Sequence, residues 1–176
     1  MSKVLVAVLL TLAMTISEQV RCADPPRTQP VTASLYASSM LVGAQLGAKM
    51  AADEGKVPQS FARCMQALGP SSLTDVVEAV LVDNLTQAEL QTSDDFYRRT
   101  AGRKFATVGM LDVYKANGKT PPADYPEVSD AEYREVEDFK NSAVGMKVSK
   151  VLESDSARRA FAARLRALAN SCGANL

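Results

Sequence analysis

Two related stretches of the chain decide its fold class: residues 86–108, TQAELQTSDDFYRRTAGRKFATV, and residues 129–151, SDAEYREVEDFKNSAVGMKVSKV. They align without gaps at an offset of 43 residues, and seven of the 23 aligned positions are identical. Three of the identical positions form a spaced motif, F-x5-G-x-K. It occurs as Phe96, Gly102 and Lys104 and again as Phe139, Gly145 and Lys147. The chain therefore contains an internal repeat, which we call the first unit (86–108) and the second unit (129–151).

Each unit begins with the sequence signature of a helix N-terminus. Thr86 and Glu89 in the first unit, like Ser129 and Glu132 in the second, have the spacing of a capping box, in which hydroxyl and carboxylate satisfy free N–H groups reciprocally. The motif Phe follows ten residues after each cap, about three helical turns along, where it can anchor the helix in the core. Each unit is thus predicted to be a helix, a tight corner and a second helix.

The corner residues lead to three further expectations. Ser142 is expected to cap the second helix of the second unit, and Thr100 the corresponding helix of the first unit. The motif Gly falls in the first turn of that helix, where Gly costs about 1 kcal/mol relative to Ala. Its recurrence predicts a close contact, with the Phe ring as the candidate partner. The motif Lys is expected to reach the carbonyls that end the preceding helix, or Asp95 or Asp138.

The rest of the sequence is also helical in pattern. Apolar residues recur at helical spacing, as in Phe61, Cys64, Met65 and Leu68, and no segment shows the sustained alternation and hairpin turns of strands. A strand is an alternative only for the β-branched segment after Ser72, the predicted N-cap of that helix. We predict a compact all-α bundle with helices over 32–53, 58–68, 72 onward, 87–99, 101–116, 130–142, 144–153 and 156–171.

In the first of these helices every fourth residue is small: Ser39, Gly43, Gly47 and Ala51. Such spacing lets another helix approach closely and is best known in membranes. Because Gln45 and Lys49 lie in the same helix, we predict close packing within a soluble bundle instead.

The two motif units resemble the signature F-Y-x-S-P-x-G-x-K, which follows a capping-box helix in bacterial secreted proteins of domain-of-unknown-function family 2059. The positions that fit this signature are Phe96, Tyr97, Gly102, Lys104, Phe139, Ser142, Gly145 and Lys147. Ala143 stands in the Pro position of the second unit, and Arg99 and Thr100 replace the Ser-Pro of the first. The resemblance covers about residues 86–153. It implies a helical domain in the bacterial envelope and brings no activity with it, because the function of that family is unassigned.

The first residues have the order of a secretory signal peptide. A short basic start precedes an uncharged run of 13 residues, Val4 to Ile16, and a polar segment that ends in small residues. The run is shorter than the ~20 residues of a membrane span, so we expect cleavage after Cys22 (or, alternatively, after Ala23) rather than an uncleaved anchor. We predict a signal peptide over 1–22, a flexible Pro-rich leader over 23–31 and a single all-helical domain over 32–176, secreted into the periplasm.

Cleavage would leave two of the three cysteines, Cys64 and Cys172, each on an apolar helical face. Exported proteins meet an oxidising environment, where a remaining pair is commonly bridged. We therefore predict a disulfide between Cys64 and Cys172 that encloses both units. Two buried free thiols are the alternative.

The composition excludes several kinds of function. The 176 residues include 20 basic and 20 acidic residues, no His and no Trp. Without His there is no Ser-His-Asp or Cys-His catalytic unit and no His-bearing metal site. A net charge of zero gives no general attraction to nucleic acid or to acidic membranes. We expect no metal, no cofactor, no nucleic acid and no membrane span after cleavage, and the oligomeric state stays open.

Two polar clusters are the candidate sites. The carboxylates around the units could supply an acid/base pair, and they are Asp94, Asp95, Glu132, Glu135, Glu137 and Asp138. Most charged residues from 124 to 138 are acidic and most from 140 to 166 are basic, which suggests a basic helical face for an anionic envelope partner. We call this the basic face, and it consists of Lys150, Arg158, Arg159 and Arg166. The interpretation we prefer from the sequence is that neighbouring helices pair these charges within the domain, and the binding face is the alternative.

Three hypotheses of function follow from the sequence. The first is a non-enzymatic envelope protein that binds another protein. The second is a carboxylate-dependent hydrolase of cell-wall or sugar substrates, and the third is a periplasmic immunity protein against a delivered toxin. We prefer the first because the sequence is rich in residues that specify a fold and carries no catalytic motif. A Ser-Lys dyad such as Ser142 with Lys147 is formally available, but no motif singles it out.

Overall fold

The computed structural model describes residues 30–173, and all of the regular structure in that range is helical. The predicted signal peptide 1–22 and nearly all of the leader 23–31 lie outside the described residues, as do residues 174–176. The eight helices in that range are α1 (Val31–Asp53), α2 (Gln59–Ala67), α3 (Ser71–Asn84), α4 (Gln87–Arg98), α5 (Thr100–Ala116), α6 (Asp130–Asn141), α7 (Ala143–Leu152) and α8 (Asp155–Ser171). The predicted all-α fold class is confirmed. None of these helices combines the length and apolar character needed to cross a membrane.

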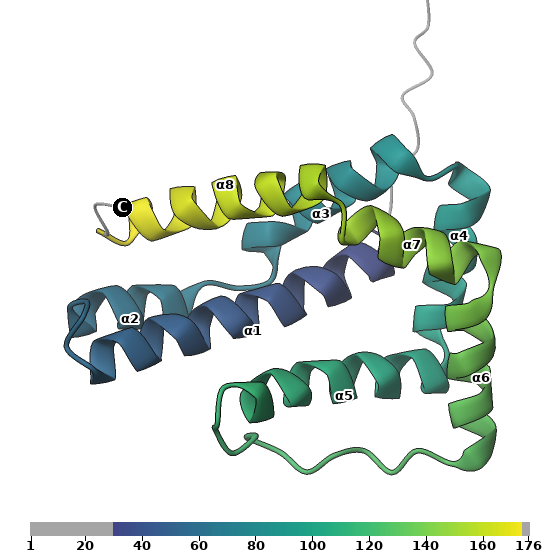
Figure 1. Ribbon diagram of the computed structural model, residues 1–176, viewed down its shortest axis with the longest axis horizontal. Helices are drawn as coiled ribbons and strands as arrows, with labels where there is room; N and C mark the ends of the chain where they lie inside the picture. Colours follow the sequence, from purple (N-terminus) through teal and green to yellow (C-terminus); the bar gives the residue numbers. More distant parts are fainter. Residues whose placement is uncertain (1–29, 174–176) are drawn as a thin grey trace, which may run out of the picture.

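Helix α1 is the centre of the arrangement. It packs against α2, α3, α4 and α5, and it crosses the middle of the molecule (Figure 1). Helix α8 packs along α3, whereas α4, α6 and α7 lie at the end of the molecule opposite α2 (Figure 1). The first unit comprises α4 and α5 and the second unit α6 and α7, so each unit is the predicted helix, corner and helix.

The observed helix ends lie within one or two residues of the predicted ones. Gly55, Gly118 and Gly173 follow the C-terminal ends of α1, α5 and α8 with φ of 71°, 65° and 88°, a left-handed conformation that Gly adopts without a side-chain penalty. The predicted Ser72 cap is wrong. Pro70 occupies the N-cap position of α3 and already has helical dihedral angles, φ −52° and ψ −33°, so the helix begins before Ser72.

The main core lies between α1, α3, α7 and α8. Its centre consists of five side chains with no exposed surface: Ala33, Ala37, Leu73, Val77 and Leu81. The three from α3 are spaced by four residues, which places them on one face of the helix. The segment for which a strand was the alternative is therefore held as a helix by its buried apolar face, although its β-branched residues lower helix propensity.

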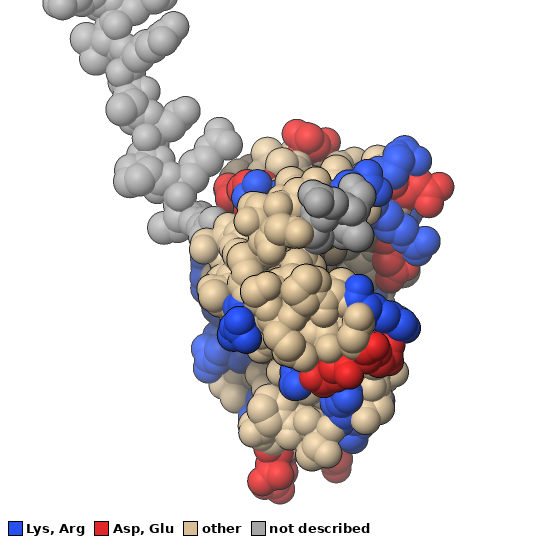
Figure 2. Space-filling view, turned by 90° about the vertical axis from the view of Figure 1, so that its left-hand side faces the viewer, with Lys and Arg blue, Asp and Glu red and all other residues tan. Residues whose placement is uncertain are grey.

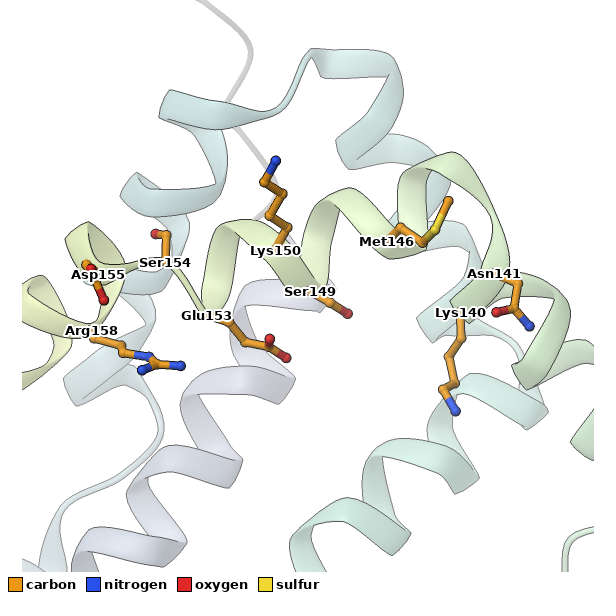
Figure 3. Close-up of a pocket in the computed structure, with 9 residues that line it drawn as sticks. All are labelled: Lys140, Asn141, Met146, Ser149, Lys150, Glu153, Ser154, Asp155 and Arg158. Atoms are coloured by element: carbon orange, nitrogen blue, oxygen red, sulfur yellow. The ribbon is translucent and has the colours of Figure 1, made fainter.

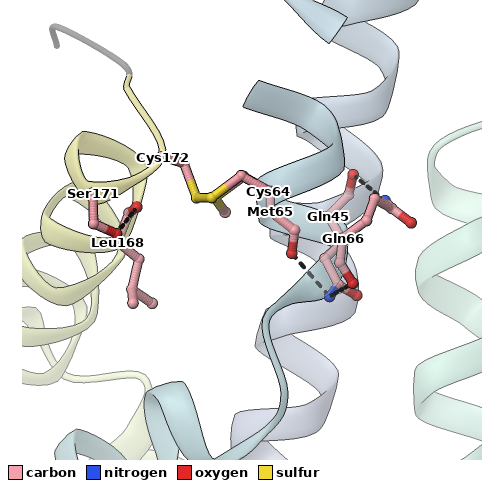
Figure 4. The surroundings of a disulfide bond; sticks show 7 residues. All are labelled: Gln45, Cys64, Met65, Gln66, Leu168, Ser171 and Cys172. Atoms are coloured by element: carbon pink, nitrogen blue, oxygen red, sulfur yellow. Dashed lines mark hydrogen bonds between the residues drawn. A yellow bond between two sulfur atoms is a disulfide. The ribbon is translucent and has the colours of Figure 1, made fainter. Parts of the chain in front are cut away.

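The predicted disulfide is present and fixes the small helix α2. Cys64 of α2 is bonded to Cys172 just after α8, 108 residues later in the sequence (Figure 4). In the chain-entropy model, a bridge that closes a loop of ~100 residues stabilises the fold by about 4.7 kcal/mol. On the other side of α2, the amide of Gln45 in α1 donates hydrogen bonds to the carbonyl oxygens of Met65 at 3.2 Å and Leu68 at 3.0 Å. Helix α2 is thus tied to both α1 and α8.

Candidate functional site

The two units face each other and exchange contacts between their motif residues. Helix α4 packs against α7, and α5 packs against α6. The Nζ of Lys104 donates a hydrogen bond to Oε2 of Glu132 at 2.7 Å. The Nζ of Lys147 in turn lies 2.8 Å from both carboxylate oxygens of Glu89. Each motif lysine therefore binds the capping-box glutamate of the other unit.

This arrangement corrects the sequence-based expectation for the two lysines. We expected each to bind its own unit, through helix-end carbonyls or through Asp95 and Asp138. The internal repeat indicated two similar units, but it contained no information that their lysines would exchange partners.

Both predicted capping boxes are formed, so each glutamate has two sets of partners. In the first unit the N–H of Thr86 donates to Glu89 at 2.8 Å, and the N–H of Glu89 donates to the Thr86 hydroxyl at 3.3 Å. Ser129 and Glu132 repeat these two distances. The hydrogen bond from the lysine of the other unit, followed by that from the capping backbone N–H, lowers the pKa of Glu89 and of Glu132 to about 2.

The motif phenylalanines join the two units at their centre. The rings of Phe96 and Phe139 are stacked, with centroids 3.9 Å apart and planes 7° from parallel. Tyr97 makes T-shaped contacts with both rings, at centroid distances of 5.0 Å and 5.7 Å. Together with Ala101 and Val136 these residues form a small apolar core between the units.

The motif glycines allow the helices of each unit to meet at the corner. A Cβ atom on Gly102 would overlap the carbonyl oxygen of Phe96 and lie 2.8 Å from the Cα of Tyr97. A Cβ atom on Gly145 would overlap the carbonyl oxygen of Phe139 and lie 2.8 Å from its carbonyl carbon. The predicted close contact is therefore present, but its partner is the backbone of the phenylalanine and not its ring.

The two corners differ in how their second helix is capped. The hydroxyl of Ser142 accepts the N–H of Gly145 at 3.0 Å and donates to the carbonyl oxygen of Phe139 at 2.7 Å, so this predicted cap is confirmed. The predicted Thr100 cap is wrong, because Arg99 occupies the N-cap position of α5 and makes no side-chain cap bond. Arg99 instead forms an ion pair with Glu135 of the second unit at 3.1 Å.

Among the candidate acid/base carboxylates, Asp94 is buried and holds the start of α1. One of its oxygens accepts the backbone N–H of Thr32 at 3.0 Å and the Thr32 hydroxyl at 2.7 Å. The Thr32 hydroxyl also lies 2.9 Å from the hydroxyl of Ser93. Asp94 therefore caps a helix from another part of the chain. Sequence reasoning missed this network, for which the only signal was a Thr at the predicted start of α1.

Most of the other candidate carboxylates are also bound to basic side chains. Asp95 pairs with Arg98, Glu132 with Lys104, Glu135 with Arg99 and Glu137 with Lys140, at distances from 2.7 to 3.3 Å. Both residues of the formally available Ser-Lys dyad have other partners, because Ser142 caps α7 and Lys147 binds Glu89. Within residues 30–173, no group of three or more Cys, Asp and Glu side chains is arranged to hold a metal ion.

The four residues of the basic face behave differently from the cations around them. Lys140, Lys147 and Arg164 pair with carboxylates of the domain. All four cations of the basic face are exposed, and no carboxylate in the described part of the chain lies within 4.0 Å of them. The ion pairs within the domain that our preferred interpretation predicts are therefore not found for this face among the described residues.

Two of these cations line a polar groove at the junction of α6, α7 and α8 (Figure 3). Lys150 and Arg158 share this groove, of about 700 Å³, with Lys140, Glu153 and Asp155. The groove also contains Met146, an exposed large apolar residue with an exposed fraction of 57%. The groove thus offers charges of both signs beside an apolar contact.

A second groove is apolar and lies between α1 and α8, with α2 at its base; we call it the apolar groove. It has a volume of about 480 Å³. It is lined by Ala44, Gly47, Ala48, Ala51, Phe61, Met65, Ala162, Leu165, Arg166 and Ala169. Arg166 of the basic face is the only charged residue in this set.

The apolar groove changes the interpretation of the small-residue stripe in α1. A Cβ atom on Gly43 would contact Val113 of α5 at 3.7 Å, so another helix does pack there. A Cβ atom on Gly47 would have no neighbouring atom within 4 Å. The predicted helix packing is therefore present at Gly43, whereas the other end of the stripe forms an open wall of the groove.

Comparison of the chain with protein-family models, with curated proteins and with solved structures finds no match. Its function is therefore inferred from the contacts and surfaces described above.

Proposed function

We propose that this chain is an exported, non-enzymatic protein of the bacterial envelope that binds another protein through the basic face. The observation that carries the proposal is that Lys150, Arg158, Arg159 and Arg166 are all exposed and have no carboxylate partner among the described residues, although neighbouring cations do. Unpaired cations along α7 and α8 attract acidic partners and accelerate their association.

The rigid support of the basic face favours recognition of a defined partner. Three of its residues belong to α8, whose first turn is capped by the hydroxyl of Ser154, which accepts the N–H of Ala157 at 3.2 Å. The other end of α8 is tied to α2 by the disulfide. The cations therefore project from a helix that is fixed at both ends, which lowers the entropy lost on binding.

The contacts of the carboxylates in the two units favour binding over hydrolysis. Glu89, Glu132 and Asp94 hold helix starts and unit contacts. The lowered pKa of Glu89 and Glu132 keeps both charged at neutral pH, whereas a general acid needs a raised pKa. Their chemistry suits structural pairing.

Export is part of the same proposal. It is supported by the basic start and the apolar run of residues 4–16, and by the disulfide, since such bonds persist mainly in oxidising compartments. Membership of domain-of-unknown-function family 2059 is also proposed, on the two F-x5-G-x-K motifs alone. It would be consistent with an envelope location.

The test is a comparison of two triple charge reversals with equal change in net charge. The first variant carries Arg158→Glu, Arg159→Glu and Arg166→Glu. The matched control carries Arg63→Glu, Lys119→Glu and Arg134→Glu, three exposed cations that also have no carboxylate within 4.0 Å among the described residues. Each full-length protein is produced in bacteria and crosslinked in the periplasm, and its partners are quantified by mass spectrometry.

We expect proteins captured by the unmodified chain to be reduced at least tenfold with the first variant and to be kept by the control. Equal capture by both variants would overturn the role of the basic face. Retention of the chain in the cytoplasm would overturn the proposed location.

A further inference from the structure

We infer that the partner binds as an amphipathic helix, whose apolar side enters the apolar groove while its acidic flank contacts Arg159 and Arg166. This inference rests on the proposed function and specifies the kind of partner. It follows from the shape of the groove, from the residues that line it and from the charges along one of its edges.

The arrangement of the groove suits the binding of a helix. Its walls are α1 and α8, which run side by side in Figure 1 but make few direct contacts, because α8 packs mainly on α3. Phe61 and Met65 of α2 belong to the same lining and are buried, with Ala48 and Ala169, in a small apolar cluster. An amphipathic helix commonly binds in such a groove through apolar residues at i, i+3, i+4 and i+7.

The small side chains along both walls permit a close approach. Ala44, Gly47 and Ala51 line the α1 side, and Ala162 and Ala169 line the α8 side. The absence of any atom within 4 Å of a Cβ position on Gly47 leaves room for a larger side chain from a partner. Each wall covers eight residues, 44–51 in α1 and 162–169 in α8, which corresponds to about 10 Å or two helical turns.

The charges along α8 define the flank of the bound helix. Arg166 lines the groove, and Arg159 lies seven residues earlier, two turns along the same edge of α8. Neither has a carboxylate within 4.0 Å in residues 30–173, and no acidic residue belongs to the groove lining. Figure 2 views the molecule from the end at which α2 and the C-terminal end of α8 lie. An uncharged area covers much of the upper and central part of that face, and acidic and basic side chains lie around and below it.

Within residues 30–173, the most acidic helix of a second copy of this chain, α6, does not supply the required surface. Val136 of α6 is buried and Phe139 is stacked on Phe96, so the one exposed large apolar residue of this helix is Tyr133, with an exposed fraction of 62%. Helix α6 therefore lacks the row of free apolar residues that would have to enter the groove. A helix from a different protein, apolar on one side and acidic along one edge, meets both requirements.

The test uses a displayed library of helix-forming 16-residue peptides, selected against the full-length protein with its disulfide intact. Enriched peptides are synthesised, and their affinity is measured by fluorescence anisotropy.

Two variants, Gly47→Leu and Ala162→Leu, fill the groove from opposite walls, each at an exposed helical position. Gly109→Leu is the matched control, since a Cβ on Gly109 of α5 also has no neighbour within 4 Å. A double reversal, Arg159→Glu with Arg166→Glu, tests the charged edge. Thermal melts by circular dichroism confirm that each variant is folded.

We expect enriched peptides with apolar residues at helical spacing and Asp or Glu along one edge. Their affinity should fall at least tenfold with either groove variant and with the charge reversal, and should be unchanged with Gly109→Leu. If the affinity fell only with the charge reversal, the groove inference would be overturned and the proposed function would stand. If the affinity fell only with the groove variants, the contact between an acidic edge and the two arginines would be overturned. Failure to enrich any peptide that requires the groove, or a dimer of the unmodified chain in sedimentation that Gly47→Leu abolishes, would overturn the inference.

Discussion

The first unit, α4 and α5, and the second unit, α6 and α7, share their motif residues but are embedded differently in the molecule. Helix α4 buries five residues, among them Ser93, Asp94 and Phe96, and it contacts α1. Helix α6 buries only Val136. The aligned acidic residues show the same difference, because Asp94 caps α1, whereas Glu137 forms an exposed pair with Lys140.

This difference separates two roles within the repeat. The residues that the units share (Phe, Gly, Lys and the capping-box Glu) form the contacts between the units. The residues that differ have other roles. Asp94 connects the first unit to α1, and Ser142 caps the second helix at the corner of the second unit. Substitutions at shared positions should therefore have equal effects in the two units, and substitutions at other positions should have unequal effects.

The largest effects should come from the motif glycines. Gly102→Ala and Gly145→Ala each place a Cβ atom on a backbone carbonyl of the preceding helix. This carbonyl cannot move away unless the two helices that meet at the corner separate. We expect each to lower the free energy of unfolding by about 3 kcal/mol, at the upper end of the cost of overpacking. Urea denaturation followed by circular dichroism measures this loss.

Gly47→Ala is the control for the glycine substitutions, because the same change occurs at an open helical position. It should raise the stability by up to about 1 kcal/mol through helix propensity. If all three substitutions had similar effects, the close contact at the corners would not be the reason for the motif glycines.

A smaller and unequal effect is expected for the aligned acidic residues. Asp94→Asn weakens a buried cap of α1 that involves Thr32, and should cost about 2 kcal/mol. Glu137→Gln removes only an exposed ion pair and should change the stability by less than about 0.5 kcal/mol. The urea midpoints of the two variants measure the difference, and equal midpoints would show that the units are embedded alike.

The corner caps should give a difference of about 1 kcal/mol. Ser142→Ala leaves the N–H of Gly145 without its acceptor and should destabilise by about 1 kcal/mol. Thr100→Ala removes no cap, because Arg99 holds the N-cap position of α5, and should be near neutral. The thermal midpoints of the two variants provide the comparison, and a larger loss for Thr100→Ala would reverse our assignment of the caps.

Acidification should weaken both units to the same extent. Glu89 and Glu132 have a pKa of about 2 in the folded protein, compared with an ordinary value of 4.5. A lowered carboxyl pKa contributes stability that is fully present above pH 4.5 and is lost as the pH falls toward 2. The thermal midpoint of the unmodified chain should therefore fall in this window more steeply than that of Glu89→Gln with Glu132→Gln. The two single variants should lie between them and coincide, whereas identical slopes for all four proteins would exclude this contribution.

Local sequence patterns predicted the helices and the local contacts of the repeat. Apolar spacing, together with the caps of the two units, indicated all eight helices, and Thr86 with Glu89 was enough to predict a capping box, because both partners lie within one turn. The disulfide could be predicted because only Cys64 and Cys172 would remain after cleavage.

Long-range contacts could not be predicted in the same way. The ammonium of Lys147 can bind any nearby carboxylate, and only the packing of α4 on α7 brings Glu89 to it. The network of Thr32 and Asp94 spans 62 residues and has no periodic signal. The apolar groove was also invisible in the sequence, since Ala162 and Gly47 become its walls only through the separation of α1 from α8.

The exchange of lysines between the units is tested most directly by double-mutant cycles. Cycles that combine Glu89→Gln with Lys147→Met and Glu132→Gln with Lys104→Met examine the contacts between units, and Met keeps much of the packing of the lysine stem. Cycles that combine Glu89→Gln with Lys104→Met and Glu132→Gln with Lys147→Met examine pairs within one unit. We predict a measurable coupling free energy in both cycles between units and none in the two cycles within a unit. Coupling confined to the pairs within a unit, or absent from all four cycles, would contradict the reciprocal arrangement.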